Sequence, residues 1–233
     1  MDENKFVNSD NRIRIIAKMT SAPVPFDKGR QVFYIKSNAP DHENNTIPIV
    51  LYDDEVKFIS HIKEGDRVVV YGRIDTQTIL RENGTHQTRM FVRLENCCLV
   101  SELPPIIKSN LIQDDVGILV GEIIKTPLDV TIPDGRILKR FILKVSKNNG
   151  TDKYNTIPLS LYGRVADSCS KLISCGQRVG VKYHLNNISK ANSQESHLVC
   201  NAFFIQAEHE IKNNPHFYDI DYKSKPEKNS PVW

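Results

Sequence analysis

Apolar and polar residues alternate along most of the chain, which is the period of a β-strand with two different faces. Ile13, Ile15 and Ala17 mark the first such run. Four more runs follow, at 32–36, 47–52, 67–79 and 86–100. Between the third and fourth runs, Val56 and Ile59 recur at helical spacing. The pattern therefore predicts three strands, a helix and a closing hairpin.

The same order of elements recurs in the second half of the chain. Residues 45–52 read Asn-Thr-Ile-Pro-Ile-Val-Leu-Tyr, and residues 155–162 read Asn-Thr-Ile-Pro-Leu-Ser-Leu-Tyr. The strands expected in the second copy are 116–124, 138–145, 157–162, 178–188 and 197–206, with a helix at 165–175. So long a period indicates a duplicated domain, since the repeats of a solenoid span roughly 20–50 residues.

Three strands, a helix and a hairpin are the element order of an OB-fold, a five-stranded Greek-key barrel. We therefore predict an all-β protein made of two tandem OB-fold barrels, each with one helix between its third and fourth strands. The predicted divisions are 1–100 for the first domain, 101–112 for a linker, 113–207 for the second domain and 208–233 for a flexible tail.

Charge and composition narrow the classes of function. The chain has 31 basic and 28 acidic side chains, so any footprint for a polyanion must be local. Its first residues lack the plan of a signal peptide, and five cysteines without a C-x-x-C pair fit a cytoplasmic location. We expect no metal site, no cofactor and no catalysis, because no motif for them occurs. Abundant Asn, Lys and Ile suggests a bacterial or phage genome.

Alternation also assigns side chains to the outer faces of the barrels, where aromatic rings lie among Lys and Arg. In the first copy these candidate binding residues are Tyr34, Lys36, Tyr52, Arg67, Tyr71, Arg73, Arg89, Phe91 and Arg93. In the second copy they are Arg140, Lys144, Tyr162, Arg178 and Lys182. Any one of them has a simpler interpretation as an ordinary surface residue. The cluster as a whole predicts single-stranded DNA binding, because bases stack on rings for about 1–3 kcal/mol each.

The aromatic count also predicts a division of labour between the copies. The first copy has more rings on its outer face, and we expect it to carry more of the binding.

Several segments resemble the bacterial single-stranded-DNA-binding protein family. Residues 121–127, 132–136 and 140–145 are similar to its first half, with a glycine after strand one, a proline six residues on, a Pro-x-Gly turn and a Phe-x-Leu-x-Val strand. Residues 161–167 are similar to its Leu-Phe-Gly-Lys-x-Ala-Glu segment, and the first copy keeps a related stretch at 65–73. The resemblance covers about 200 of the 233 residues and suggests a tandem OB-fold member.

This resemblance carries expectations of its own. It implies a role in DNA replication, repair or recombination, and it puts Tyr52 and Tyr162 at a stacking aromatic of strand three. Because the family commonly uses four OB domains, it implies a homo-oligomer in which two chains supply them. It also implies that the C-terminal tail recruits replication proteins. Here Thr46 and Thr156 stand where the family has Trp, and the tail lacks the family's acidic run.

A second interpretation remains open. The chain could be an OB-fold protein–protein adaptor in a replication, conjugation or phage complex, with little affinity for nucleic acid. The small net charge and the missing Trp positions favour this alternative, whereas the clustered outer Tyr, Arg and Lys oppose it.

Overall fold

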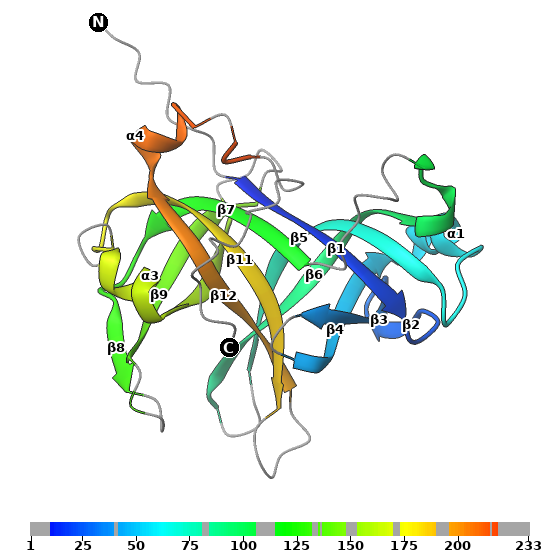
Figure 1. Ribbon diagram of the computed structural model, residues 1–233. Coiled ribbons are helices and arrows are strands. Elements are labelled where there is room, and N and C mark those ends of the chain that lie inside the picture. The colour runs from blue at the N-terminus through cyan, green and yellow to red at the C-terminus, as the bar shows by residue number, and fades with distance from the viewer. Residues whose placement is uncertain are drawn as a thin grey trace, which may run out of the picture.

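Each predicted set of strands closes into its own barrel because its first strand pairs on both sides. The computed structural model describes residues 10–39, 42–80, 84–105, 115–131, 135, 137–147, 153–169, 173–189, 196–214 and 216–218. In the first barrel β1 pairs with β3 and β5, and in the second β7 pairs with β9 and β11. Figure 1 shows the two barrels side by side. This confirms the predicted fold of two tandem OB-fold barrels.

The elements of the first barrel are β1 (Asp10–Met19), β2 (Val24–Asp27), β3 (Arg30–Ala39), β4 (His42–Tyr52), the 3-10 turn η1 (Asp53–Glu55), α1 (Val56–Ile59), β5 (Arg67–Leu80) and β6 (His86–Leu99). After the turn η2 (Val100–Glu102), the second barrel has β7 (Asp115–Ile123), β8 (Leu128–Thr131), β9 (Ile137–Ser146), β10 (Tyr154–Tyr162), α3 (Gly163–Ser168), β11 (Arg178–Ser189), β12 (Ser196–Ala207) and α4 (Glu208–Ile211).

The predicted core faces are confirmed. In the first barrel the buried rows include Ile13, Ile15 and Ala17 on β1, and Phe33 and Ile35 on β3. In the second barrel Tyr183, which alternates with Val181 and Leu185 along the sequence, is fully buried with them. A side chain at Gly117 would collide with its ring, so this glycine makes room for the tyrosine.

Two short strands were not predicted. The proline-containing segment between the first two predicted strands lies outside all of them, but Val24–Asp27 forms β2 and pairs with β3. It lies at one end of the strand order, and an edge strand is where a proline is tolerated. The equivalent strand of the second barrel, β8, pairs with β9 at the other end of the order.

The two barrels share one continuous sheet. β1 pairs antiparallel with β7, from Asp10 opposite Val120 to Ile15 opposite Asp115, so that twelve strands form a single sheet. The two barrels are therefore joined by backbone hydrogen bonds, and not only by the covalent connection.

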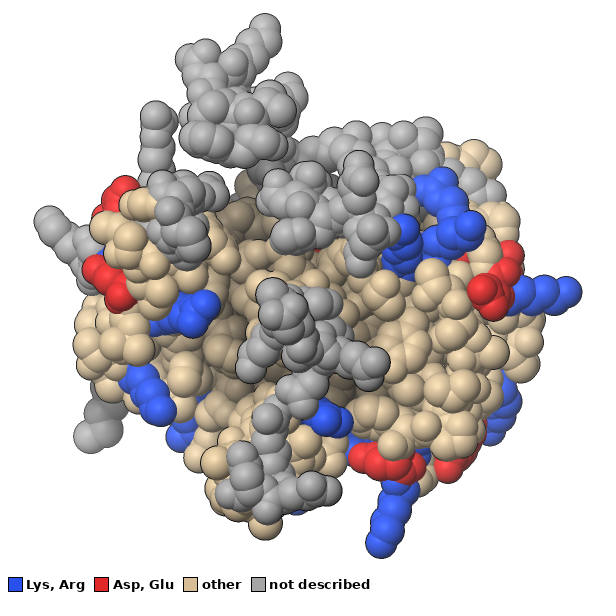
Figure 2. All heavy atoms as spheres, turned by 90° about the horizontal axis from the view of Figure 1, so that it is seen from below, with Lys and Arg blue, Asp and Glu red and all other residues tan. Residues whose placement is uncertain are grey.

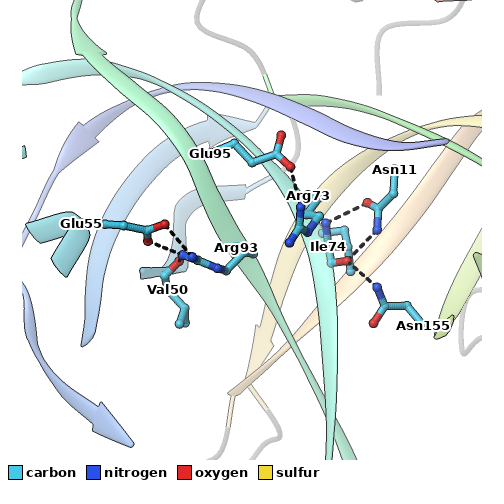
Figure 3. A network of polar contacts seen from close by, with 8 residues as sticks. All are labelled: Asn11, Val50, Glu55, Arg73, Ile74, Arg93, Glu95 and Asn155. Atoms are coloured by element: carbon cyan, nitrogen blue, oxygen red, sulfur yellow. Dashed lines mark hydrogen bonds and ion pairs between the residues drawn. The ribbon is translucent and has the colours of Figure 1, made fainter. Parts of the chain in front are cut away.

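The repeated Asn-Thr-Ile-Pro motif fixes the barrels against each other. Asn45 of the first copy donates to the carbonyl of Leu185 (2.5 Å) and accepts from the backbone N–H of Asn187 (2.7 Å), both on β11. Asn155 of the second copy accepts from the N–H of Thr76 (3.1 Å) and donates to the carbonyl of Ile74 (3.2 Å), both on β5. Figure 3 shows the contact of Asn155 with Ile74. Each copy of the motif thus contacts the other barrel.

The first residues of the expected flexible tail are in fact packed. Glu208–Ile211 form α4, and residues 208–214 and 216–218, called the segment 208–218 below, place the buried side chains of Ile211 and Phe217 against Ile118 and Val120. A side chain at Gly180 would collide with both Ile211 and Phe217, so this glycine forms their seat. The prediction fails here because two buried residues in an otherwise polar segment are too few to produce a pattern. Residues 219–233 lie outside the described part of the chain.

The contact of Asn45 generates a test of how the barrels are joined. Because Asn45 is only 1% exposed, Asn45→Ala removes its two hydrogen bonds to β11 and a third to Ser37 from the interior, and we expect a loss of about 1–3 kcal/mol in the free energy of unfolding. Urea denaturation of the full chain measures it. Asn96→Ala, at an exposed position of β6, is the matched control and should change little. Equal losses for the two variants would contradict the role of Asn45.

Candidate nucleic-acid interface

The predicted binding residues divide into three groups by exposure. The exposed ones are Tyr34, Tyr52, Arg67, Tyr71, Arg89, Arg140 and Lys144. The half-buried ones are Lys36, Arg73, Tyr162, Arg178 and Lys182. Phe91 and Arg93 are buried. Burial alone therefore removes two of the candidates from direct contact with a ligand.

Tyr52 forms a fixed aromatic platform at the end of β4. The guanidinium of Arg93 lies under its ring, with Cζ 3.9 Å from the ring centroid. Arg93 is held in turn by two hydrogen bonds to the carboxylate of Glu55 (2.7 and 2.8 Å) and by one to the carbonyl of Val50 (3.2 Å) (Figure 3). Glu55 also accepts from the N–H of Tyr52 (2.7 Å). The ring is thereby held from below, while 48% of the residue stays exposed.

This geometry corrects the role expected of Arg93. Its strand position faces outward, as alternation predicts, but it is only 5% exposed and its hydrogen bonds go to Glu55 and Val50. A guanidinium committed in this way is not available to a phosphate. Arg93 positions the Tyr52 ring instead.

Phe91 needs the same kind of correction. It faces outward from β6, but the unpredicted strand β2 folds over this part of the barrel. Phe26 of β2 meets Phe91 edge to face, with ring centroids 5.9 Å apart, and Val32 and Val50 complete a small apolar cluster. Phe91 is therefore part of a second core and does not offer its ring to a base.

Arg30 fastens β2 in this position, and its role was missed. Its guanidinium lies 5.5 Å from the ring centroid of Phe26 and 5.3 Å from that of Phe91. It is paired with Asp27 and donates to Gln77 (3.2 Å). The hydrogen bond from Arg30 is the main cause of a lowered pKa of the Asp27 carboxyl. The Asp27 to Arg30 spacing across a turn is the signal that could have indicated this pair.

The remaining cations of the first barrel differ in their surroundings. Arg73 forms an ion pair with Glu95 (2.9 Å). Arg67 and Arg89 are exposed and have no ion-pair partner among the residues that the structure describes. Arg67 and Tyr71 pair with β1, whereas Tyr52 lies on β4, so the structure does not bring them together.

In the second barrel, two of the predicted cations are bound to the segment 208–218. Arg178 is paired with Glu208 (3.1 Å), and Lys182 donates to the carbonyl of His216 (3.1 Å) beside the ring of Phe217. Both were expected to face a ligand. They instead hold a segment that the sequence analysis assigned to the tail.

Tyr154 is an exposed aromatic that the sequence analysis missed. It begins β10, it is 50% exposed, and the Nζ atom of Lys144 lies 4.6 Å from its ring centroid. Its signal was present, because Tyr154, Thr156 and Pro158 alternate with the core residues and so share a face with Tyr162. The strand was predicted to begin only at residue 157.

The charges do not form a single basic stripe on the face shown in Figure 2. Lys and Arg lie dispersed around its rim, and several of them stand next to Asp or Glu.

Over the described part of the chain, no group of three or more His, Cys, Asp or Glu residues could hold a metal ion. Burial raises the pKa of the Cys97 thiol to about 12. Within the same residues, no helix has the length and apolar character needed to cross a membrane.

Solved structures with a similar fold have been found. The single-stranded DNA binding protein from Thermus aquaticus is 15% identical, with a TM-score of 0.63 over 86% of this chain and 94% of that chain. A deletion variant of that protein gives the same TM-score and covers 95% of its chain. The second single-stranded DNA binding protein from Mycobacterium smegmatis is 20% identical over 41% of this chain, with a TM-score of 0.33. No protein-family model and no curated protein matches the sequence.

These comparisons place the chain in a structural class. It is a tandem OB-fold protein, and its two barrels align with nearly the whole length of the Thermus aquaticus protein. The resemblance noted from the sequence is thus confirmed at the level of the fold.

The Glu55–Arg93 pair generates a prediction about pH. Burial raises the pKa of Glu55, but the hydrogen bonds from Arg93 and from the Tyr52 N–H outweigh it and leave the pKa below its ordinary value of 4.5. A lowered pKa contributes stability above pH 4.5 that is lost as the pH falls through the folded-state value. Glu55→Gln should therefore lose stability at neutral pH and depend less on pH below 4.5 than the wild type.

Urea denaturation at a series of pH values measures this difference. Glu64→Gln, which changes an exposed glutamate near the end of the same connection, is the control and should follow the wild-type curve. If Glu55→Gln follows that curve too, the ion pair does not hold the platform.

Proposed function

We propose that the protein binds single-stranded DNA without catalysis, through aromatic and basic residues on the outer faces of its two barrels. The observation that carries this proposal is the Tyr52 platform, a half-exposed ring fixed on Arg93 at the outer surface of an OB-fold barrel. A ring held in place loses little conformational entropy when a base stacks on it. The exposed cations Arg67, Arg89 and Arg140 support the proposal because phosphates attract them.

The broader setting is part of the same proposal. We place the protein in the cytoplasm, in DNA replication, repair or recombination, with two chains supplying four OB domains and residues 219–233 recruiting replication proteins. The similarity in fold to the Thermus aquaticus single-stranded DNA binding protein supports this setting. The segment 208–218 already covers the outer face of β7 and β11, so an oligomer would use another surface. The domain divisions near residues 100 and 112 remain predictions.

A second candidate function rests on a specific observation. Arg30, Arg73 and Arg93 are all paired with carboxylates of the protein itself, which lowers the positive charge offered to a polyanion. An OB-fold adaptor that binds another protein would have no need of free cations on the outer face of the first barrel. Nucleic-acid binding by the full chain separates the two candidates.

A titration of the full chain with labelled oligo-dT tests the proposed function. We expect tighter binding to single-stranded than to duplex DNA, and an affinity that falls with salt as counterions are released. Tyr52→Ala should weaken binding by about 1–3 kcal/mol through lost stacking, without unfolding the barrel. Leu51→Ala, one residue earlier in the fully buried row, should instead cost about 2–5 kcal/mol of folding stability.

Absence of measurable binding to a long oligo-dT at low salt would favour the adaptor. If Tyr52→Ala loses stability and keeps its affinity, the platform is structural. The full chain is the appropriate material because isolated barrels would lose the pairing of β1 with β7.

The expected division of labour is tested with the same titration. The structure removes Phe91 from the rings of the first barrel and adds Tyr154 to those of the second, so the difference in count is smaller than the sequence indicates. We still expect Tyr52→Ala to weaken binding more than Tyr162→Ala, because Tyr52 has a guanidinium beneath it.

A further inference from the structure

The outer face of β9 and β10 carries a row of exposed groups between two tyrosines. Tyr162 lies at one end of β10 and Tyr154 at the other, roughly 26 Å apart at about 3.3 Å per residue. Between them on β9 lie Arg140, opposite Ser160, and Lys144, opposite Thr156. Alternation puts all four side chains on the same face, away from the barrel core. This row is called the β9–β10 track below.

The two cations of this track differ from Arg30, Arg73 and Arg93 of the first barrel, each of which forms an ion pair with a carboxylate. Arg140 and Lys144 are exposed, and neither forms an ion pair within the described part of the chain. Asp129 of the neighbouring strand β8 is paired with Lys139 (2.6 Å). Glu122, whose Cα pairs with that of Lys144 across β7, is the acidic residue nearest in the ladder. Neither cation is therefore committed to a direct ion pair in the described part of the chain, and Glu122 is the one carboxylate that stands across a strand from the track.

Tyr154 and Lys144 already make a contact that suits a base and its phosphate. The ammonium of Lys144 lies 4.6 Å from the centroid of the ring, which is within the range of a cation–π interaction. With half of Tyr154 exposed, the ring still has surface on which a base can stack. The ammonium beside it is placed to meet the phosphate of the stacked nucleotide.

The equivalent positions of the first barrel match this track only in part. There, Val32 and Val50 stand opposite each other where the second barrel has Arg140 and Ser160, and both valines are buried in the cluster with Phe26. Lys36, opposite Thr46, and Tyr52 are the first-barrel counterparts of Lys144 and Tyr162, so Arg140 and Tyr154 are the residues that distinguish the second barrel.

We propose that Tyr154 is a stacking residue for a single strand of nucleic acid that runs along the β9–β10 track, with Lys144 contacting a phosphate beside the stacked base. This inference rests on the proposed function and assigns to the second barrel a binding surface of its own.

Substitutions of Tyr154 in the full chain test this inference with labelled oligo-dT. Tyr154→Ala should raise Kd by about 5- to 150-fold, as expected for the loss of one stacked base. Tyr154→Phe keeps the ring and should stay near the wild-type Kd. Phe58→Ala is the matched control, because Phe58 is also an exposed aromatic under a lysine, with Lys57 Nζ 5.1 Å from its centroid, but on α1 of the first barrel. It should leave Kd unchanged.

Lys144→Ala provides an independent readout. Removing one phosphate contact should reduce the slope of log Kd against log salt concentration by about 0.7 for a single strand. Photocrosslinking with a bromodeoxyuridine oligonucleotide should in addition recover the peptide that contains Tyr154.

The outcomes separate the two proposals. If the wild type binds and Tyr52→Ala weakens binding, but Tyr154→Ala behaves like Phe58→Ala, the β9–β10 track is overturned and the proposed function stands. If the wild type binds no oligonucleotide, both are overturned.

Discussion

The antiparallel pairing of β1 with β7 is the interaction on which the rest of the molecule depends. Each of these strands already closes its own barrel, so the pairing between them turns two barrels into one twelve-stranded sheet. It also covers two edges that would otherwise present unpaired backbone groups. The contacts of Asn45 and Asn155 follow from it, because they require β5 and β11 to lie beside the opposite barrel. The segment 208–218 then packs across this sheet and ends with Tyr218 near Arg12 of β1.

Regular alternation made the barrels predictable from the sequence. Rows such as Ile47, Ile49 and Leu51 are long enough to show both the strand and its buried face, and the repeat doubles the signal. β2 was missed because four residues with a proline give no period, although their Phe26 covers part of the outer face of the first barrel. The segment 208–218 was missed because its few apolar residues are spaced by polar ones.

The candidate site was predicted less well than the fold. Alternation states whether a side chain points in or out, and it did so correctly for Arg93 and Phe91. It contains no information about what lies above an outward side chain. Here β2 lies above Phe91, and the carboxylate of Glu55 binds Arg93. For the same reason, alternation could not predict that Arg178 and Lys182 are bound to the segment 208–218. Only tertiary structure distinguishes a free cation from one that is already occupied.

The reciprocal contacts of the Asn-Thr-Ile-Pro motif have a consequence for how such a chain evolves. Equivalent residues that make equivalent contacts are what a two-fold symmetric homodimer has at its interface. In a homodimer every substitution appears twice, so the outer faces of the two copies must change together. Once the copies are joined in one polypeptide, each face is free to change alone while the shared contacts keep the geometry. Val32 with Val50 on one barrel, and Arg140 with Ser160 at the same place on the other, are the kind of divergence that covalent joining permits.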